Sequence, residues 1–394
     1  MKEFVKSNQQ QNANAEAPLT VQSDSIPANS NEDDGFNADA FAERVLKDKI
    51  VFRAKNDGGQ YVSFFNKKGC RETLRLDSDE LNDFLIDQFH QETNKSILSS
   101  KFSAVLQRLK ARAKRGGAFY SIHSRIAMQG DSLFYNLGNE SGHIVHVDRT
   151  GWRIVSGSKL PKEIMFKKTE LAAPQVLPVR TEKTVADLLQ PFIHLGGKDF
   201  QLFVIALLSL FLEEIAKPVI SLDGIGGSGK TTIAKLIQEL VDPVRDNLTS
   251  TLPENSRDVQ AFLGALYLAK YDNADTIRGN ISNILCNSVT GGAVVARRLY
   301  TNGGVYAQSF RNAIVLNGVN ISELRPDFAS RVVAFELRRF GNEGDKRLAE
   351  TQLWLKFEAL RGELLGAIFN TLAAAYATEA INEISILLSQ FCHY

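Results

Sequence analysis

The sequence predicts an α/β fold whose core is a parallel sheet flanked by helices. Two observations support this class. Short apolar segments, partly β-branched, recur in the second half of the chain and are typical of buried strands. They are residues 218–222, 265–272, 313–316 and 332–337. The first of them leads into a glycine-rich loop, after which apolar residues recur at helical spacing from Ile233 to Val241, and Pro243 ends the helix.

Composition divides the chain into five parts. At 394 residues and 44% hydrophobic content it is long enough for two or three domains with a substantial core. Residues 1–43 are rich in Gln, Asn, Ser and Asp and predict a disordered tail. The remaining parts are predicted as an α+β accessory domain at 44–178, a helical collar at 179–216, the α/β core at 217–340 and a helical lid at 341–394.

Charge and cysteine content exclude several classes of protein. The net charge is +1, so nucleic-acid binding must come from local patches. Three widely spaced cysteines suggest neither a disulfide framework nor a zinc cluster. The most apolar run, Leu202–Leu212, is far shorter than the ~20 residues of a membrane span and is expected to be a core helix. With no apolar signal segment at the N-terminus, we expect a soluble, cytoplasmic protein without membrane contact.

Residues Gly224–Thr231 fit the phosphate-binding pattern G-x-x-x-x-G-K-[ST] at every position. The strand before the loop and the helix after it provide the context that this motif needs, which disfavours a chance glycine turn. Lys230 is expected to neutralise the β and γ oxygens of ATP, and Thr231 to offer its hydroxyl to Mg²⁺. The residues expected to bind the nucleotide are Gly224, Gly226, Gly227, Ser228, Gly229, Lys230, Thr231 and Thr232.

The strand at 265–272 ends in Asp272, which suits a second magnesium ligand; the alternative is a surface aspartate after a core strand. Asn273 follows, where many ATPases carry a glutamate that activates water. Asparagine cannot accept a proton, so the base could be Asp275 or Glu254, or Asn273 could only orient the water.

Two further strands end or begin with candidate catalytic residues. Asn317 follows the strand at 313–316 and suits a polar sensor of the γ-phosphate. Arg331 enters the strand at 332–337 and is placed where one subunit can reach the nucleotide of its neighbour, a contact that can contribute ~10³ to 10⁵ in rate. The alternative is an ordinary salt-bridged arginine.

A hairpin is predicted around Asn302-Gly303, because both residues tolerate the positive φ of a tight turn. Arg297, Arg298 and Tyr300 lie on its approach. Charge with aromatic residues on a protruding hairpin suits contact with a nucleic-acid backbone, while an ordinary edge hairpin is the alternative.

The accessory domain is predicted to begin with paired strands at 61–65 and 73–76, joined by a turn at 66–69, and two helices at 78–91 and 96–114. The second helix and its end are basic, with no carboxylate. Phosphate contact and a solvated helix face are equally good interpretations. The candidate DNA contacts here are Lys110, Arg112, Lys114 and Arg115.

These residues together resemble the superfamily 3 helicases within the AAA+ ATPases, and more closely the primase-associated replication ATPases of phages, plasmids and integrative elements. The resemblance covers Tyr61 to about Ala375. It is densest in Gly224–Thr232, Tyr271–Asn273, Thr290–Gly292, Arg298–Thr301, Leu316–Gly318, Arg325–Asp327 and Ser330–Arg331.

The resemblance implies a P-loop AAA+ core and assigns roles to several residues. Asp272-Asn273 looks like the subgroup's own magnesium motif, Asn317 would be sensor 1, and Arg331 would be the finger donated between subunits, with Arg325 as a rival. The Asn302 hairpin would be the pore element. The resemblance also implies a ring-forming homo-oligomer, expected to be a hexamer. The chain has no primase motif, so a separate primase or initiator would supply priming.

The sequence therefore predicts an ATP-hydrolysing DNA helicase or translocase of a mobile element. Two rivals stay open. A P-loop phosphotransferase would act on a small molecule without oligomerising. An AAA+ switch would bind ATP to assemble a partner complex, with little hydrolysis and no unwinding, and Asn273 favours this reading.

Overall fold

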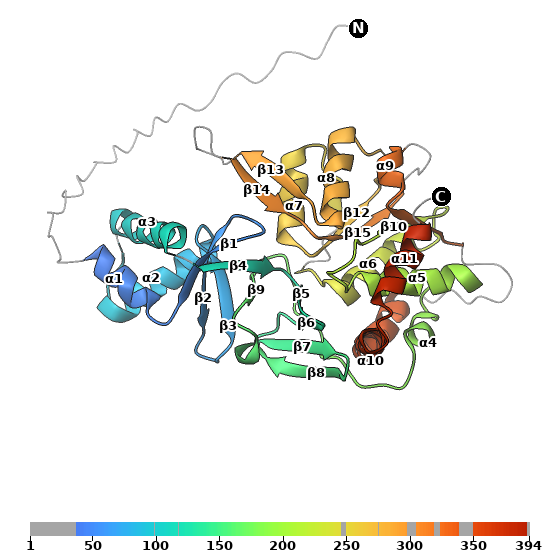
Figure 1. The fold of residues 1–394 in the computed structure, drawn as a ribbon, viewed down its shortest axis with the longest axis horizontal. Helices are drawn as coiled ribbons and strands as arrows, with labels where there is room; N and C mark the ends of the chain where they lie inside the picture. The colour runs from blue at the N-terminus through green and yellow to red at the C-terminus, as the bar shows by residue number, and fades with distance from the viewer. Residues whose placement is uncertain are drawn as a thin grey trace, which may run out of the picture. The chain divides into compact units, whose positions relative to one another are not determined.

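Figure 1 shows the fold as a computed structural model, which describes residues 37–97, 99–116, 118–245, 250–274, 276–297, 305–318, 324–338 and 350–391. Most of the predicted tail lies outside these ranges. Its boundary at residue 43 is wrong, because helix α1 (Ala38–Leu46) begins within it. Phe41 and Ala42 are fully buried, and the Phe41 ring packs edge-on against Phe89. The apolar residues of this segment recur at helical spacing, so they form one face of α1 that is buried in the core.

Residues 38–178 are called the N-terminal module here. Its first sheet has the order β3-β2-β1-β4-β9, with β1 antiparallel to β2 and parallel to β4. The predicted strand pair and both predicted helices are confirmed, with Tyr61 opposite Arg75 and Phe65 opposite Arg71. The elements are β1 (Ile50–Ala54), β2 (Gln60–Phe65), β3 (Arg71–Arg75), α2 (Asp79–Thr93), α3 (Ser99–Arg115), β4 (Ala118–His123) and β9 (Ile164–Phe166).

A second sheet of the module is an antiparallel meander in the order β5-β6-β7-β8. Its strands are β5 (Ile126–Gln129), β6 (Ser132–Asn136), β7 (His143–Asp148) and β8 (Gly151–Ser156), followed by the 3-10 turn η1 (Gly157–Lys159). The inward residues Leu133, Tyr135, Val145 and Val147 are fully buried and belong to the same apolar cluster as the core of the second half of the chain. The two sequence halves therefore share one core.

Two helices lead from the module to the core sheet. Helix α4 (Val185–Leu189) begins at Thr184, whose side chain forms a capping box with Asp187. Helix α5 (Gly197–Ser209) carries the most apolar run of the chain, and Phe203, Ala206 and Leu207 are fully buried. The expectation of a core helix here is confirmed.

The core sheet has the order β11-β12-β15-β10-β16, and each neighbouring pair is parallel. The predicted strands are confirmed, although β12 starts at Leu268 because the segment before it closes a helix. The strands are β10 (Val219–Asp223), β11 (Ser250–Thr251), β12 (Leu268–Asp272), β15 (Ala313–Asn317) and β16 (Val332–Glu336). The connecting elements are α6 (Lys230–Val241), α7 (Ser256–Ala265), α8 (Gly279–Thr290), the hairpin β13 (Ala293–Arg297) and β14 (Val305–Ser309), and α9 (Pro326–Ala329).

Successive residues of a core strand contact opposite layers, as a strand's alternation requires. Ile220 belongs to the cluster formed with α5, α6 and α10, whereas Val219 belongs to the cluster formed with α7, α8 and α9. Figure 1 shows α7 and α8 on one side of this sheet and α5 and α6 on the other. All five residues of β15 are buried, as expected for a strand covered on both faces.

The predicted C-terminal helical part consists of α10 (Glu350–Ala377) and α11 (Ile381–Phe391). Helix α10 packs on α4, β7 and β8. At Gly366 a Cβ would lie 1.8 Å from the carbonyl oxygen of Val179, so only glycine lets the chain cross here. By residue contacts, the chain from Ala38 onward forms one compact unit.

Within the described residues no single helix has the length and apolar character to cross a membrane, and one bent pair, α10 with α11 at 106°, passes by length and composition.

Candidate nucleotide site

The loop between β10 and α6 has the backbone conformation that its glycines allow. Gly224, Gly227 and Gly229 have φ values of 135°, 82° and 88°, which residues other than glycine rarely adopt. At Gly224 a Cβ would also lie 2.5 Å from the carbonyl oxygen of Leu337. At Gly226 and Gly227 a Cβ would meet nothing within 4 Å, so that side of the loop is open.

The N-terminus of α6 faces this open loop without a side-chain cap among the described residues, since its cap residue is Gly229. The first amides of a helix lack intrahelical partners and carry partial positive charge. The hydroxyl of Ser228 is also buried and has no partner within the described part of the chain. The loop thus presents unsatisfied donors of the kind that bind anions.

Lys230 folds back over the loop. Its amine donates to the carbonyl oxygens of Gly224 at 2.5 Å and Ile225 at 3.3 Å. Nearby, burial raises the pKa of the Asp223 carboxyl, and the negative charge of Glu336 raises it further. The hydrogen bond from Ser221 and the positive charge of Lys230 lower this pKa, but by less. Lys230 is the cation that lowers the pKa of Asp223, so the loop places a positive charge beside the end of β10.

Three polar side chains meet at the carboxyl ends of the neighbouring strands. The hydroxyl of Thr231 donates to Asp272 Oδ2 at 3.4 Å and accepts from Asn317 Nδ2 at 3.3 Å. Thr231 is in the first turn of α6, Asp272 ends β12 and Asn317 ends β15. Because β15 lies between β10 and β12 and all are parallel, these ends gather at one edge.

Asn273 has a role that the sequence pattern did not reveal. Its φ is 53°, the left-handed region in which asparagine is several-fold enriched. Its backbone N–H donates to Asn317 Oδ1 at 3.0 Å, and the N–H of Ala274 donates to the Asn317 carbonyl at 3.1 Å. Asn317 therefore bridges the turn after β12 to Thr231. Of the other candidates for the base, Glu254 is ion-paired with Arg278 at 2.9 Å, and Asp275 lies outside the described residues.

Both candidate finger arginines are engaged within their own chain. Arg331 pairs with Asp327 Oδ1 at 2.7 Å and also donates to the Asp327 carbonyl, while its Nε, among the described residues, has no partner. Arg325 donates to Asn283 Oδ1 at 2.9 Å and to the Gly279 carbonyl at 3.2 Å. In the single chain, the two guanidinium groups are thus bound to residues of α8 and α9.

The predicted hairpin is confirmed in its strands, which pair from Ala293 opposite Ser309 to Arg297 opposite Val305. Its tip, with Arg298, Tyr300 and Asn302, lies outside the described residues, and of Arg297 only the backbone is described.

The basic helix α3 has carboxylate partners that sequence reasoning missed. Arg112 pairs with Glu43 at 2.8 Å and Arg108 with Asp39 at 3.2 Å, both on α1. The sequence left phosphate contact and a solvated helix face open for these cations; pairing with α1 was not foreseen, because residues 1–43 were predicted to be a disordered tail. Lys114 and Arg115 are exposed at the end of the helix, and Lys110 is half-buried.

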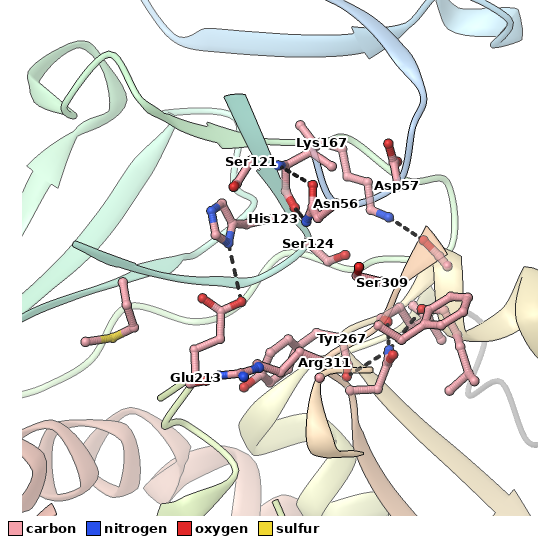
Figure 2. Close-up of a pocket in the computed structure, with 18 of the residues that line it drawn as sticks. Asn56, Asp57, Ser121, His123, Ser124, Lys167, Glu213, Tyr267, Ser309 and Arg311 are labelled. Atoms are coloured by element: carbon pink, nitrogen blue, oxygen red, sulfur yellow. Dashed lines mark hydrogen bonds and ion pairs between the residues drawn. The ribbon is translucent and has the colours of Figure 1, made fainter. Parts of the chain in front are cut away.

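A separate cavity of about 360 Å³ lies where the N-terminal module meets the core, and sequence reasoning missed it (Figure 2). His123 Nδ1 lies 3.3 Å from Glu213 Oε1, and the amide of Ser309, at the base of the hairpin, donates to the Asn56 carbonyl at 2.6 Å. Burial favours a raised pKa for Glu213, but its hydrogen bond to His123 and nearby cations hold the pKa below its usual value. Tyr267, which directly precedes β12, also lines the cavity. The cavity therefore lies at the edge of the core sheet opposite the phosphate loop.

Fold and site together define a mixed α/β protein with a glycine loop, a threonine, an aspartate and an asparagine gathered at one sheet edge. The family model described as "Actinomycete integrative conjugative element replication protein" matches residues 187–394, more than half of the chain. The chain belongs to this family. The resemblance to replication proteins of integrative elements is thereby confirmed at the level of the family.

Two solved structures align with most of the chain. The apo C-terminal region (305–718) of NrS-1 aligns with a TM-score of 0.47 and 12% identity, over 89% of this chain and 74% of that one. The structure titled "SCCmec type IV Cch - active helicase" aligns with a TM-score of 0.43 and 13% identity, over 85% and 62%. No curated protein sequence matches the chain significantly.

Proposed function

We propose that this chain is an ATP-hydrolysing motor of the AAA+ class, of the superfamily 3 type, which forms a ring and moves on DNA during replication of an integrative element. Membership of the replication-protein family supports the biological setting. The observation that carries the proposal is the convergence of Thr231, Asp272 and Asn317 beside the glycine loop.

The residues present fit Mg²⁺ and ATP. Within the described residues no group of three His, Cys, Asp or Glu side chains could hold a metal. Mg²⁺ instead takes one or two protein oxygens together with phosphates and waters, which Thr231 and Asp272 can supply. The partnerless hydroxyl of Ser228 and the uncapped amides of α6 suit the phosphates.

Each residue of the site would then have one task. Bound Mg²⁺ and ATP supply the phosphoanhydride bond and the charge that draws electrons toward the leaving group. Lys230 would exchange its loop carbonyls for phosphate oxygens, Thr231 and Asp272 would hold the ion, and Asn317 would orient the attacking water or the terminal phosphate.

The ring assignment rests on the two candidate finger arginines, which among the described residues are both paired away from the phosphate loop. An arginine at the terminal phosphate, in addition to the lysine of the loop, accelerates phosphoryl transfer by ~10³ to 10⁵. Arg331 is held by Asp327 through an i,i+4 pair that is partly exposed and so is easily exchanged for a stronger anion. An arginine released from this pair could reach the nucleotide of an adjacent subunit, and Arg325 is the second candidate.

DNA contact is assigned to two elements. Strand β13 ends at Arg297, which Arg298 follows in the sequence, and α3 ends in Lys114 and Arg115. Together they would follow a phosphate backbone through a channel, as charged and aromatic residues do in other single-strand binders.

An ATP-driven switch without unwinding is the second candidate, favoured by Asn273. In this chain its side chain cannot accept a proton, and its conformation gives a structural reason for asparagine at this position. Such a switch would bind ATP and assemble a complex with little turnover.

ATP turnover with and without single-stranded DNA separates these functions. The motor hypothesis predicts turnover that DNA stimulates and that Lys230→Ala abolishes; Lys198→Ala, an exposed lysine on α5, is the control and should keep wild-type turnover. ATP binding with negligible turnover in the wild type would favour the switch. Turnover that depends on a small-molecule substrate and not on DNA would instead point to a phosphotransferase.

A further inference from the structure

The carboxyl end of helix α6 is held by side chains from three other parts of the chain. Its last three carbonyls, residues 239–241, have no partner within the helix. Tyr135 of β6 donates to the Val241 carbonyl at 3.1 Å. Gln175, near the end of the N-terminal module, donates to the Glu239 carbonyl at 2.9 Å, and Arg361 of α10 donates to the same carbonyl at 2.8 Å. Gln175 also donates to residue 240 at 3.1 Å.

A buried ion pair, Arg125–Asp242, lies beside these contacts, and the whole cluster of Arg125, Tyr135, Gln175, Asp242 and Arg361 is called the hub. Arg125 Nε donates to Asp242 Oδ1 at 2.7 Å, and both side chains are 2% exposed. The other nitrogens of Arg125 donate to the carbonyls of Asn136, Ala173 and Pro243. Each nitrogen of the guanidinium thus has at least one partner, and a buried charge is tolerated when it is paired and hydrogen-bonded.

Asp242 joins helix α6 to strand β12. Its second oxygen, Oδ2, accepts from the amides of Tyr267 at 2.8 Å and Leu268 at 3.1 Å, where β12 begins. One carboxylate therefore fixes the end of α6 against the start of β12, and Arg125 of the N-terminal module fixes that carboxylate.

The opposite ends of these two elements carry the candidate magnesium ligands. Thr231 lies in the first turn of α6, and Asp272 is the last residue of β12. The Asp272 carboxylate lies 3.4 Å from the Thr231 hydroxyl. Helices and strands transmit displacement along their length as nearly rigid rods. A shift between the two elements at Asp242 would change the separation of Thr231 and Asp272.

We propose that Arg125 is a positioning residue for the nucleotide site: through Asp242 the N-terminal module sets the alignment of α6 with β12, and hence the geometry of Thr231 and Asp272 toward Mg²⁺. This inference rests on the proposed nucleotide function. It gives the module a part in ATP turnover that is separate from any contact with DNA.

The test is the Mg²⁺ dependence of the full-length chain, read by ATP turnover and by binding of a fluorescent ATP analogue. In Arg125→Lys, which keeps the charge but loses the fork, we expect the Mg²⁺ concentration for half-maximal turnover to rise about tenfold. Affinity for the analogue without Mg²⁺ should stay within twofold, because the loop itself is unchanged. A purely structural role would lower the melting temperature without moving the Mg²⁺ midpoint.

Tyr135→Phe keeps the proposal testable if Arg125→Lys does not fold. The substitution removes one hydroxyl from a fully buried ring of the same shape, and the midpoint should rise two- to threefold. The matched control is His123→Gln, which breaks another link between module and core, to Glu213, without touching α6. Its midpoint should equal that of the wild type.

An Mg²⁺ midpoint within twofold of wild type in folded Arg125→Lys, or unchanged in Tyr135→Phe, would overturn the inference, as would an equal shift in His123→Gln. Failure of the proposed function looks different: the wild type would then neither bind the analogue nor turn over ATP, whatever residue stands at position 125.

Discussion

The side chain of Asn317 shows at the scale of one residue how the candidate site is organised. It donates to Thr231 and accepts from the backbone of Asn273, so that the ends of two strands and the start of a helix are held by one amide. The sequence pattern placed Asn317 at a strand end, but not its bridging role. That role depends on the positive φ of Asn273, which local sequence does not specify.

At the same scale, Arg331 decides whether the site is shared between subunits. Arg331→Ala should bind ATP but hydrolyse it at least a hundredfold more slowly, because the missing cation is needed only for transfer. Mixing this variant with Lys230→Ala subunits should restore some turnover, since each can complete the site of the other. No recovery at any mixing ratio would contradict a finger acting between subunits.

Lys217 provides a prediction about stability. It is fully buried before β10, its amine 3.4 Å from the Arg311 carbonyl, and burial lowers its pKa to about 7 from the ordinary 10.5, against the attraction of Glu213. Between these two pH values the unfolded chain binds a proton that the folded chain lacks, so stability rises with pH in this window. Below pH 7 both states are protonated and the full destabilisation remains.

Lys217→Met should therefore raise the melting temperature at pH 7 by about 2–5 °C, and the gain should shrink as pH approaches 10.5. Thermal unfolding followed at both ends of this window checks it. The exposed Lys198→Met is the control for the change in side-chain chemistry. A gain of equal size at pH 7 and pH 10 would show that the charge of Lys217 is not the cause.

At the scale of elements, the sequence was most informative where a single local pattern decides the structure. The core strands are apolar and bounded by polar residues, and the glycine loop needs positive φ, so both could be predicted. Helix α1 was missed although its apolar residues recur at helical spacing, because the polar composition of the preceding segment was taken to continue to residue 43. Missing α1 also affected the interpretation of the basic helix α3, because Asp39 and Glu43 of α1 are ion-pair partners of its arginines.

The basic residues of α3 should accordingly divide into two groups. Lys114→Ala with Arg115→Ala should weaken DNA binding and reduce the slope of log affinity against log salt by about 1.5, since two exposed cations are removed. Arg108→Ala with Arg112→Ala should leave DNA affinity nearly unchanged and lower stability by at most about 1 kcal/mol per pair, because these cations already face carboxylates of α1 in exposed ion pairs. Fluorescence anisotropy over a salt series, with thermal unfolding in parallel, separates the two; equal loss of affinity in both variants would refute the division.

At the scale of the whole molecule, composition suggested successive domains, whereas contacts join the chain from Ala38 onward into one unit. The contacts responsible are distant in sequence. Arg125 and Asp242 are 117 residues apart, and Trp152 donates to Asn370 at 2.8 Å across 218 residues. No periodicity or motif specifies such pairs, so the hub at the end of α6 and the cavity beside His123 could be found only in the folded chain.

The central claim is that Lys230 and Asp272 of one subunit share a nucleotide with an arginine of the next. The most direct test is to measure particle mass and ATP turnover per subunit in the same samples, over a range of protein concentrations, with Mg²⁺ and ATP, on and off DNA. Turnover per subunit should rise with concentration in step with ring formation. A monomer that hydrolyses ATP at the full rate on and off DNA would contradict the claim.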